Sequence, residues 1–218
     1  GWDNSYLCDV LQAHPTRFAG VCLVDPGDPR APQELARWNR AGCQGLRINL
    51  IAQRDVDWLL AAGMRPVWSQ AIALNMSLSL QMLPAHAAVV AELAAGCAEL
   101  TIIIDYLGPD AFHVAAGRKA VRALARRPNT MYKVLALGMD SHEPHPYRDL
   151  WPLYETAAEA FGAERLLFGT DFPHVYLTGS YGAGAAWLGE LPFLDDAERQ
   201  MISDTNPRRL WRFPEERG

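Results

Sequence analysis

Residues 100–135, LTIIIDYLGPDAFHVAAGRKAVRALARRPNTMYKVL, contain the pattern that decides the fold. The apolar run at 100–105 predicts a buried strand, and the run at 130–135 predicts another. Between them, apolar residues three and four positions apart over 114–127 predict an amphipathic helix. Because both strands are nearly continuous apolar runs rather than alternating ones, we expect them to lie parallel beneath covering helices.

The same alternation extends along the chain. Four further apolar runs predict strands at 19–24, 45–50, 76–81 and 165–169. Four further segments predict helices at 31–41, 55–62, 84–96 and 147–161. This order indicates an α/β fold with a parallel sheet. Six strands are either an open sheet or part of a (β/α)8 barrel, whose first two units would then lie before Gly1. No linker or change in composition divides residues 1–218, so a single domain is expected.

Composition excludes several classes of protein. The 218 residues include seven each of Trp, Tyr and Phe, which is unlike a disordered chain. A net charge of -5 with scattered basic residues argues against nucleic-acid binding. Residues 66–91 carry no charged side chain, yet their Ser, Gln, Asn, Pro and His residues are too polar for a lipid-facing helix. We therefore expect no membrane partner.

The cysteines and the first residues bear on the compartment. Cys8, Cys22, Cys43 and Cys97 are widely spaced, with no CxxC pair, which favours buried reduced thiols over disulfides or zinc ligands. The start, GWDN, has neither the basic nor the apolar region of a signal peptide. The expected location is the cytoplasm.

The strongest candidate site is the stretch 165–174, RLLFGTDFPH. An apolar strand ends at Gly169 and is followed by Asp171 and His174, where parallel α/β folds gather catalytic groups. A carboxylate there can activate water as a general base or bind a metal. The alternative interpretation is an Asp that caps the following turn.

These residues resemble a known family. GTDFPH is similar to the last-strand motif, GSD followed by Trp or Tyr, Pro and His, of the amidohydrolase-related family in the amidohydrolase superfamily. Further matches follow in order along nearly the whole chain: 13–26 (AHPTRFAGVCLVDP), 45–49 (GLRIN), 80–84, 104–109 (IDYLGP), 129–133 (NTMYK) and 204–210 (DTNPRRL). The resemblance implies a TIM (β/α)8-type barrel with about six βα units in this chain, on the lactonase-like branch of the family.

The resemblance also implies roles for individual residues. Asp171 would be the catalytic base, and Tyr106 would donate a hydrogen bond to the developing oxyanion. Arg47 would hold a substrate carboxylate, or else form a structural salt bridge inside the barrel. Lys133 would line the pocket, or else form an ion pair inside the barrel. Gln81 would also line the pocket, and His174 would orient Asp171 or contact the substrate.

Two departures from the family pattern concern metal binding. The His-x-His of the family's first strand is absent, as expected if the first two strands are missing. Tyr106 replaces the His of the family's DHLG motif, and a neutral phenol is a poor zinc ligand. His142 and His145 are interpreted as exposed loop residues, and His14, His86 and His113 as structural ones.

A catalytic zinc site usually has three protein ligands. The strand ends provide Asp171 and, as a weaker second candidate ligand, His174. No cofactor is therefore expected from this sequence. A divalent metal, zinc or manganese, would need ligands from the missing strands and would take Asp171 as its ligand here.

Together these features predict a hydrolase that opens a small carboxylated or sugar-derived lactone or ester with water activated by Asp171. One alternative is a metal-dependent nonoxidative decarboxylase of a small aromatic or unsaturated acid. Another is a catalytically inactive barrel used for binding. The expected partner is a small-molecule substrate, and the commonest assembly for such an enzyme would be a homodimer.

Overall fold

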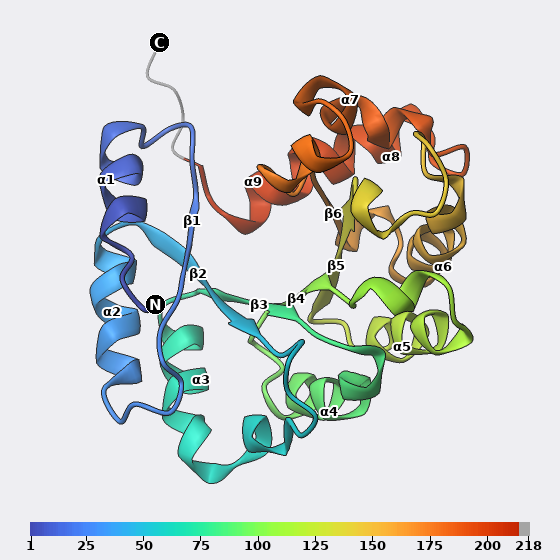
Figure 1. The fold of residues 1–218 in the computed structure, drawn as a ribbon. Helices are drawn as coiled ribbons and strands as arrows, with labels where there is room; N and C mark the ends of the chain where they lie inside the picture. Colours follow the sequence, from blue (N-terminus) through green and yellow to red (C-terminus); the bar gives the residue numbers. More distant parts are fainter. Residues whose placement is uncertain (214–218) are drawn as a thin grey trace.

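The computed structural model describes residues 1–213, which form one curled, fully parallel sheet. Its six strands are paired in the order in which they occur in the sequence, so each βα unit lies beside the next (Figure 1). The strands are β1 (Gly20–Cys22), β2 (Cys43–Asn49), β3 (Ser77–Gln81), β4 (Ile102–Tyr106), β5 (Thr130–Leu135) and β6 (Leu166–Gly169). All six expected strands are confirmed, as is the α/β class.

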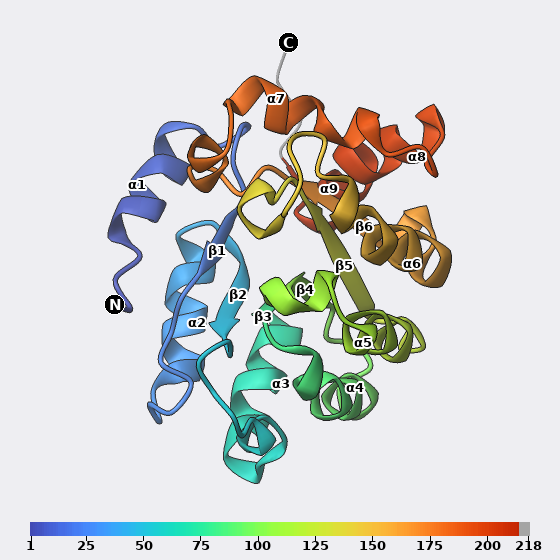
Figure 2. The ribbon, with the colours of Figure 1, turned by 45° about the vertical axis from the view of Figure 1, so that its right-hand side comes forward.

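Helices cover the convex face of the sheet, and the turned view shows the strands fanning around an interior that they share (Figure 2). The covering helices are α2 (Ala31–Arg40), α3 (Arg65–Ala73), α4 (Ala87–Gly96), α5 (Ala115–Ala125) and α6 (Trp151–Phe161). The remaining helices are α1 (Ser5–Ala13), α7 (Tyr181–Ala186), α8 (Asp196–Gln200), the π-helix Met201–Thr205 and α9 (Asn206–Leu210).

The prediction of a helix at 55–62 is wrong in both position and length. Only a short 3-10 helix, η1 (Asp57–Leu60), forms there, and the helix after β2 is α3. Pro66 lies in the first turn of α3, where its fixed φ and missing N–H suit a helix start. Val67, Trp68 and Ala71 then give α3 a buried face at helical spacing.

The two faces of the sheet have different chemistry. Leu46, Leu78 and Ile102 lie side by side across β2, β3 and β4 and belong to the main core beneath the helices. Their sequence neighbours point to the concave face, where the corresponding row reads Arg47, Ser79 and Ile103. On that face, Ile103, Met131 and Leu167 form a small separate apolar cluster with Leu210 and Trp211.

Polar side chains hold the ends of the barrel where the strands begin. Asn129 donates from Nδ2 to the carbonyls of Ala94, Cys97 and Leu100 at 2.9–3.0 Å. Buried Asn206 donates in the same way to Ala163 and Leu166, and the Arg165 guanidinium donates to Ala125 and Arg127. Each satisfies backbone carbonyls that leave a helix or enter a strand. The motifs at 129–133 and 204–210 therefore include residues that stabilise the fold.

Two further observations concern membrane spans and disulfides. Among residues 1–213, none of the helices combines the length and the apolar character needed to cross a bilayer. All four cysteines are free thiols, with Cys8, Cys22 and Cys43 buried.

A substitution at Gly117 tests how closely α5 packs against the short 3-10 helix η4 (Pro109–Phe112). A Cβ at this position would lie 1.9 Å from the Ala111 carbonyl oxygen, whereas a Cβ on Gly96 at the end of α4 meets nothing within 4 Å. We expect Gly117→Ala to lower the free energy of unfolding by roughly 1–3 kcal/mol through overpacking. Gly96→Ala should instead raise it by about 0.5 kcal/mol. Urea denaturation of both variants measures the difference, and equal effects would contradict the close approach.

Candidate active site

The carboxyl ends of neighbouring strands bring most of the expected site residues to the concave side. The strand pairing sets Asn49 of β2 beside Gln81 of β3, and Gln81 beside Tyr106 of β4. Arg47 and Lys133 lie one layer deeper, and Asp171 follows the end of β6. This is the end of a parallel sheet at which such folds place their chemistry.

Asp105 lies at the centre of this face, and its role is missing from the sequence analysis. Its Oδ1 pairs with Lys133 Nζ, and its Oδ2 is 3.4 Å from Arg47 Nε. The Asp105 side chain is only 10% exposed, so its charge requires such compensation. Arg47 and Lys133 therefore both form salt bridges inside the barrel, which was the alternative interpretation of each residue. In the sequence, the signal for the role of Asp105 was an acidic residue at the end of the apolar run 100–105.

An irregularity in β4 directs two consecutive side chains into the site. Leu80 pairs with Ile104, but the next residue, Gln81, pairs with Tyr106, so Asp105 is an extra residue in the ladder. A bulge of this kind lets neighbouring residues reach the same side of a sheet. Asp105 reaches Arg47 and Lys133, while Tyr106 reaches the loop after β5.

Tyr106 is paired with a carboxylate that the sequence analysis also missed. Its Oη donates to Asp140 Oδ2 at 2.8 Å, and Asp140 lies in the 3-10 helix η5 (Gly138–Asp140). Burial raises the pKa of Asp140, and the nearby charge of Asp171 acts in the same direction. Burial and the hydrogen bond to Asp140 also raise the pKa of Tyr106, so the phenol keeps its proton. No periodic pattern marks the loop that carries Asp140, which is why sequence alone did not single it out.

Asp171 and His174 lie together as expected from the GTDFPH motif. His174 Nδ1 is 3.5 Å from Asp171 Oδ2, and Asp171 has a left-handed backbone with φ of 54°. That conformation is uncommon outside glycine and is enriched at functional positions. The Asp171 side chain is 34% exposed, so water can reach it. A narrow crevice beside it is lined in part by Gly138, His174 and Thr178.

Among residues 1–213, the strand ends do not bring three metal-ligand side chains together. Asp105 is committed to Arg47 and Lys133, which leaves Asp171 with His174. Within the part of the chain that the structure describes, the group with metal-ligand spacing is His113, His142 and Asp149. His142 is an exposed loop residue, as expected. His113 is exposed too, its ring stacks against that of His142, and its Nε2 contacts the backbone oxygen of Asp140. Of the other histidines, His86 is buried between Leu83 and Gln53.

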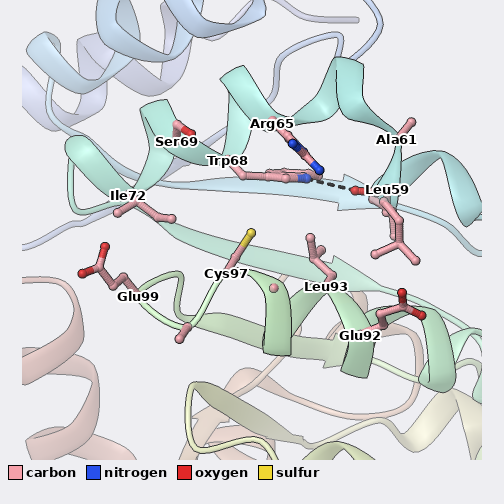
Figure 3. Close-up of a pocket in the computed structure, with 13 residues that line it drawn as sticks. Leu59, Ala61, Arg65, Trp68, Ser69, Ile72, Glu92, Leu93, Cys97 and Glu99 are labelled. Atoms are coloured by element: carbon pink, nitrogen blue, oxygen red, sulfur yellow. Dashed lines mark hydrogen bonds between the residues drawn. The ribbon is translucent and has the colours of Figure 1, made fainter.

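A well-defined cavity lies away from these residues. It has a volume of about 750 Å³ and lies between α3 and α4 in the outer layer, where Trp68, Leu93 and Cys97 line it (Figure 3). None of the strand-end residues takes part in its lining. Reaction chemistry is therefore better placed on the concave face, where carboxylates, cations and a phenol meet.

Comparison with known proteins identifies the family of the chain. A family model for amidohydrolases matches residues 1–213. The chain is 30% identical over 195 residues to an L-fucono-1,5-lactonase of Burkholderia ambifaria, which covers 85% of this chain and 66% of the lactonase. It thus spans about two thirds of the length of that relative.

Two solved structures share the fold. A protein of Pseudomonas putida assigned as a 2-pyrone-4,6-dicarboxylic acid hydrolase has a TM-score of 0.85 and 26% identity, over 99% of this chain and 80% of that one. A zinc-bound amidohydrolase of Burkholderia multivorans has a TM-score of 0.86 and 21% identity, over 97% of this chain and 79% of that one. The match along residues 1–213 and the shared barrel-type fold place the chain in the amidohydrolase family.

Proposed function

We propose that this protein is a hydrolase that opens a small carboxylated or sugar-derived lactone. The observation that carries the proposal is Asp171, a water-accessible carboxylate in a left-handed conformation at the end of β6, beside His174. The relatives named for lactone substrates support the choice of bond. The proposal also covers three properties of the whole protein: the extent of its domain, its use of a metal and the identity of its substrate.

The chemistry follows from the positions of the charged groups. Asp171 removes a proton from water as the water oxygen attacks the lactone carbonyl carbon. The resulting oxyanion collapses, the bond to the ring oxygen breaks, and that oxygen takes up a proton to become a hydroxyl. His174 holds the Asp171 carboxylate in position. The ring oxygen takes its proton from Asp171, which returns to the carboxylate form. The hydroxy acid that forms loses a proton to the solvent, so the overall reaction consumes one water and releases one proton.

Arg47 is suited to hold an anionic group of the substrate. Its Nε faces Asp105, and the Arg47 side chain as a whole is 39% exposed, so a ligand can reach it. A planar fork of this kind can bind a carboxylate through two hydrogen bonds. Lys133, which also pairs with Asp105, adds positive charge below the site, and Gln81 offers an amide at its edge.

Tyr106 and Asp140 form the second polar group of the site. In the described structure the phenol proton points to Asp140, so Tyr106 would serve the oxyanion by turning this hydrogen bond toward the substrate. The charge of Asp171 raises the pKa of both residues, so the pair lies near the proposed base. A hydrogen-bond donor near a general base suits the opening of a lactone.

Replacing Asp171 tests the base. Asp171→Asn keeps the size of the side chain but cannot accept the proton, and we expect kcat/KM for a hydrolysed lactone to fall by roughly 10²–10⁴-fold. L-Fucono-1,5-lactone and 2-pyrone-4,6-dicarboxylate are the first substrates to assay. Asp9→Asn, at an exposed position on α1, is the matched control and should keep full activity. A loss below tenfold in Asp171→Asn would remove Asp171 as the base, and release of carbon dioxide would favour the decarboxylase instead.

Replacing Arg47 tests how the substrate is held. Arg47→Lys keeps a cation for Asp105 but loses the planar fork, so we expect KM for a carboxylated lactone to rise about tenfold or more. KM for the uncharged sugar lactone should change far less, which makes the two substrates each other's control. An equal change in KM for both substrates would show that Arg47 pairs with Asp105 and does not bind the substrate. Ligand stabilisation that needs Arg47 but not Asp171, without turnover, would indicate an inactive binding barrel.

Replacing Tyr106 tests the hydrogen-bond donor. Tyr106→Phe should lower kcat about 10- to 100-fold with little change in KM, because the lost hydrogen bond acts on the transition state. Tyr132→Phe removes a buried hydroxyl from β5 and is the matched control, for which kcat should stay within threefold. Steady-state kinetics on both variants gives the comparison. An unchanged kcat in Tyr106→Phe would restrict Tyr106 to holding Asp140.

A further inference from the structure

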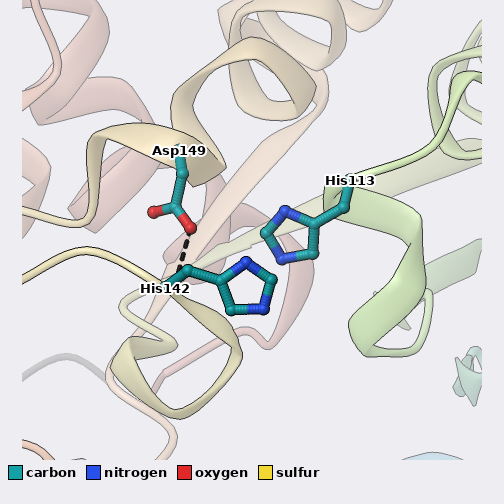
Figure 4. A group of neighbouring side chains, drawn as sticks. All are labelled: His113, His142 and Asp149. Carbon is teal, nitrogen blue, oxygen red and sulfur yellow. Dashed lines mark hydrogen bonds between the residues drawn. The ribbon is translucent and has the colours of Figure 1, made fainter.

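Two histidines and a carboxylate meet at the rim of the site without a role in the proposed hydrolysis. His113 ends the turn after η4, His142 lies in the loop after β5, and Asp149 lies in the 3-10 helix η6 (Arg148–Leu150). One donor atom from each lies within 4.8 Å of the other two. Figure 4 shows the two rings side by side, with the Asp149 carboxylate near them.

His113 is held as a metal-binding histidine usually is. Its Nε2 is 3.0 Å from the backbone oxygen of Asp140. A carbonyl oxygen only accepts, so Nε2 carries the proton and Nδ1 of the neutral ring keeps its lone pair free. A hydrogen bond from the second ring nitrogen to a backbone carbonyl orients ligating histidines in many metal sites.

Asp149 is fixed in place by two hydrogen bonds. Its Oδ1 accepts from the Ser141 hydroxyl, and its Oδ2 accepts from the backbone N–H of His142 at 2.7 Å. Each carboxylate oxygen has a second lone pair, so these bonds leave the group able to bind a cation. The second bond also sets the distance between Asp149 and the His142 side chain.

The two rings need only small movements to share one ion. Their centroids are 4.3 Å apart and their planes are 14° from parallel, which places the in-plane lone pairs side by side rather than toward one point. Ligands on a tetrahedral zinc with bonds of about 2.0–2.1 Å lie roughly 3.3 Å apart. His142 is exposed, so rotation of its side chain can close the remaining gap while His113 keeps its contact with the Asp140 carbonyl.

We propose that His113, His142 and Asp149 bind a divalent transition metal, with zinc the ion best suited to two imidazoles and one carboxylate. The site is separate from Asp171 and does not depend on the proposed hydrolysis. A bound ion would link η4 to the loop at 138–150. Since that loop carries Asp140, the ion would also hold the partner of Tyr106 in position.

Equilibrium dialysis of the purified protein against ZnCl2 tests the site. His142→Ala and Asp149→Asn should each bind one zinc fewer than the parent, or bind that zinc at least tenfold more weakly. Asp171→Asn should retain it, which separates this ion from any held at the strand ends. His14→Ala, which removes an exposed histidine after α1, is the matched control and should bind as the parent does.

Cobalt(II) provides a second readout that does not rely on stoichiometry. A tetrahedral cobalt complex absorbs strongly in the visible range, and we expect this absorption in the parent and in His14→Ala but not in His113→Ala or His142→Ala. Circular dichroism confirms that each variant is folded. Equal zinc binding and equal cobalt spectra in the parent and the His142→Ala variant would overturn the proposal.

Discussion

The concave face of the barrel depends on the charge of Asp105. This carboxylate is almost buried, and it is held between a guanidinium from β2 and an ammonium from β5. Removing one partner from such a buried pair typically costs about 3–5 kcal/mol, because an uncompensated charge remains. The ion network therefore links β2, β4 and β5 across the sheet, and it places positive charge where an anionic substrate would approach.

The sheet separates stability from chemistry by its two faces. On the convex face, Leu46, Leu78 and Ile102 pack into the core with the covering helices. On the concave face, one residue further along, β2 and β3 carry the polar Arg47 and Ser79, whereas β4 carries the apolar Ile103. The bulge at Asp105 adds a second polar side chain from β4, so that a single strand supplies both the centre of the ion network and the phenol of Tyr106.

Much of the fold could be predicted from the sequence, because buried parallel strands are continuous apolar runs. The strand and helix around residues 100–127 illustrate this. The helix after β2 was misplaced, because the apolar residues of 55–62 look helical, while the start of α3 depends on Pro66. Motifs in the sequence could single out three residues of the site, Asp171, Arg47 and Tyr106. Their roles stay predictions. Asp140 and the pair of His113 with His142 could not be singled out, because loop geometry brings them together from segments without periodicity.

The order of the strands also has a consequence for how the chain reaches its final shape. Every strand pairs with its immediate predecessor, so each βα unit can be added to a growing sheet during synthesis, without waiting for distant segments. Contacts of another kind follow α9, where Trp211 donates to Ser77, 134 positions earlier in the chain, and Arg212 donates to Gln44. These contacts can form only after all six strands have been made. Trp211 and Arg212 would thus fasten the starts of β2 and β3 after the sheet has assembled.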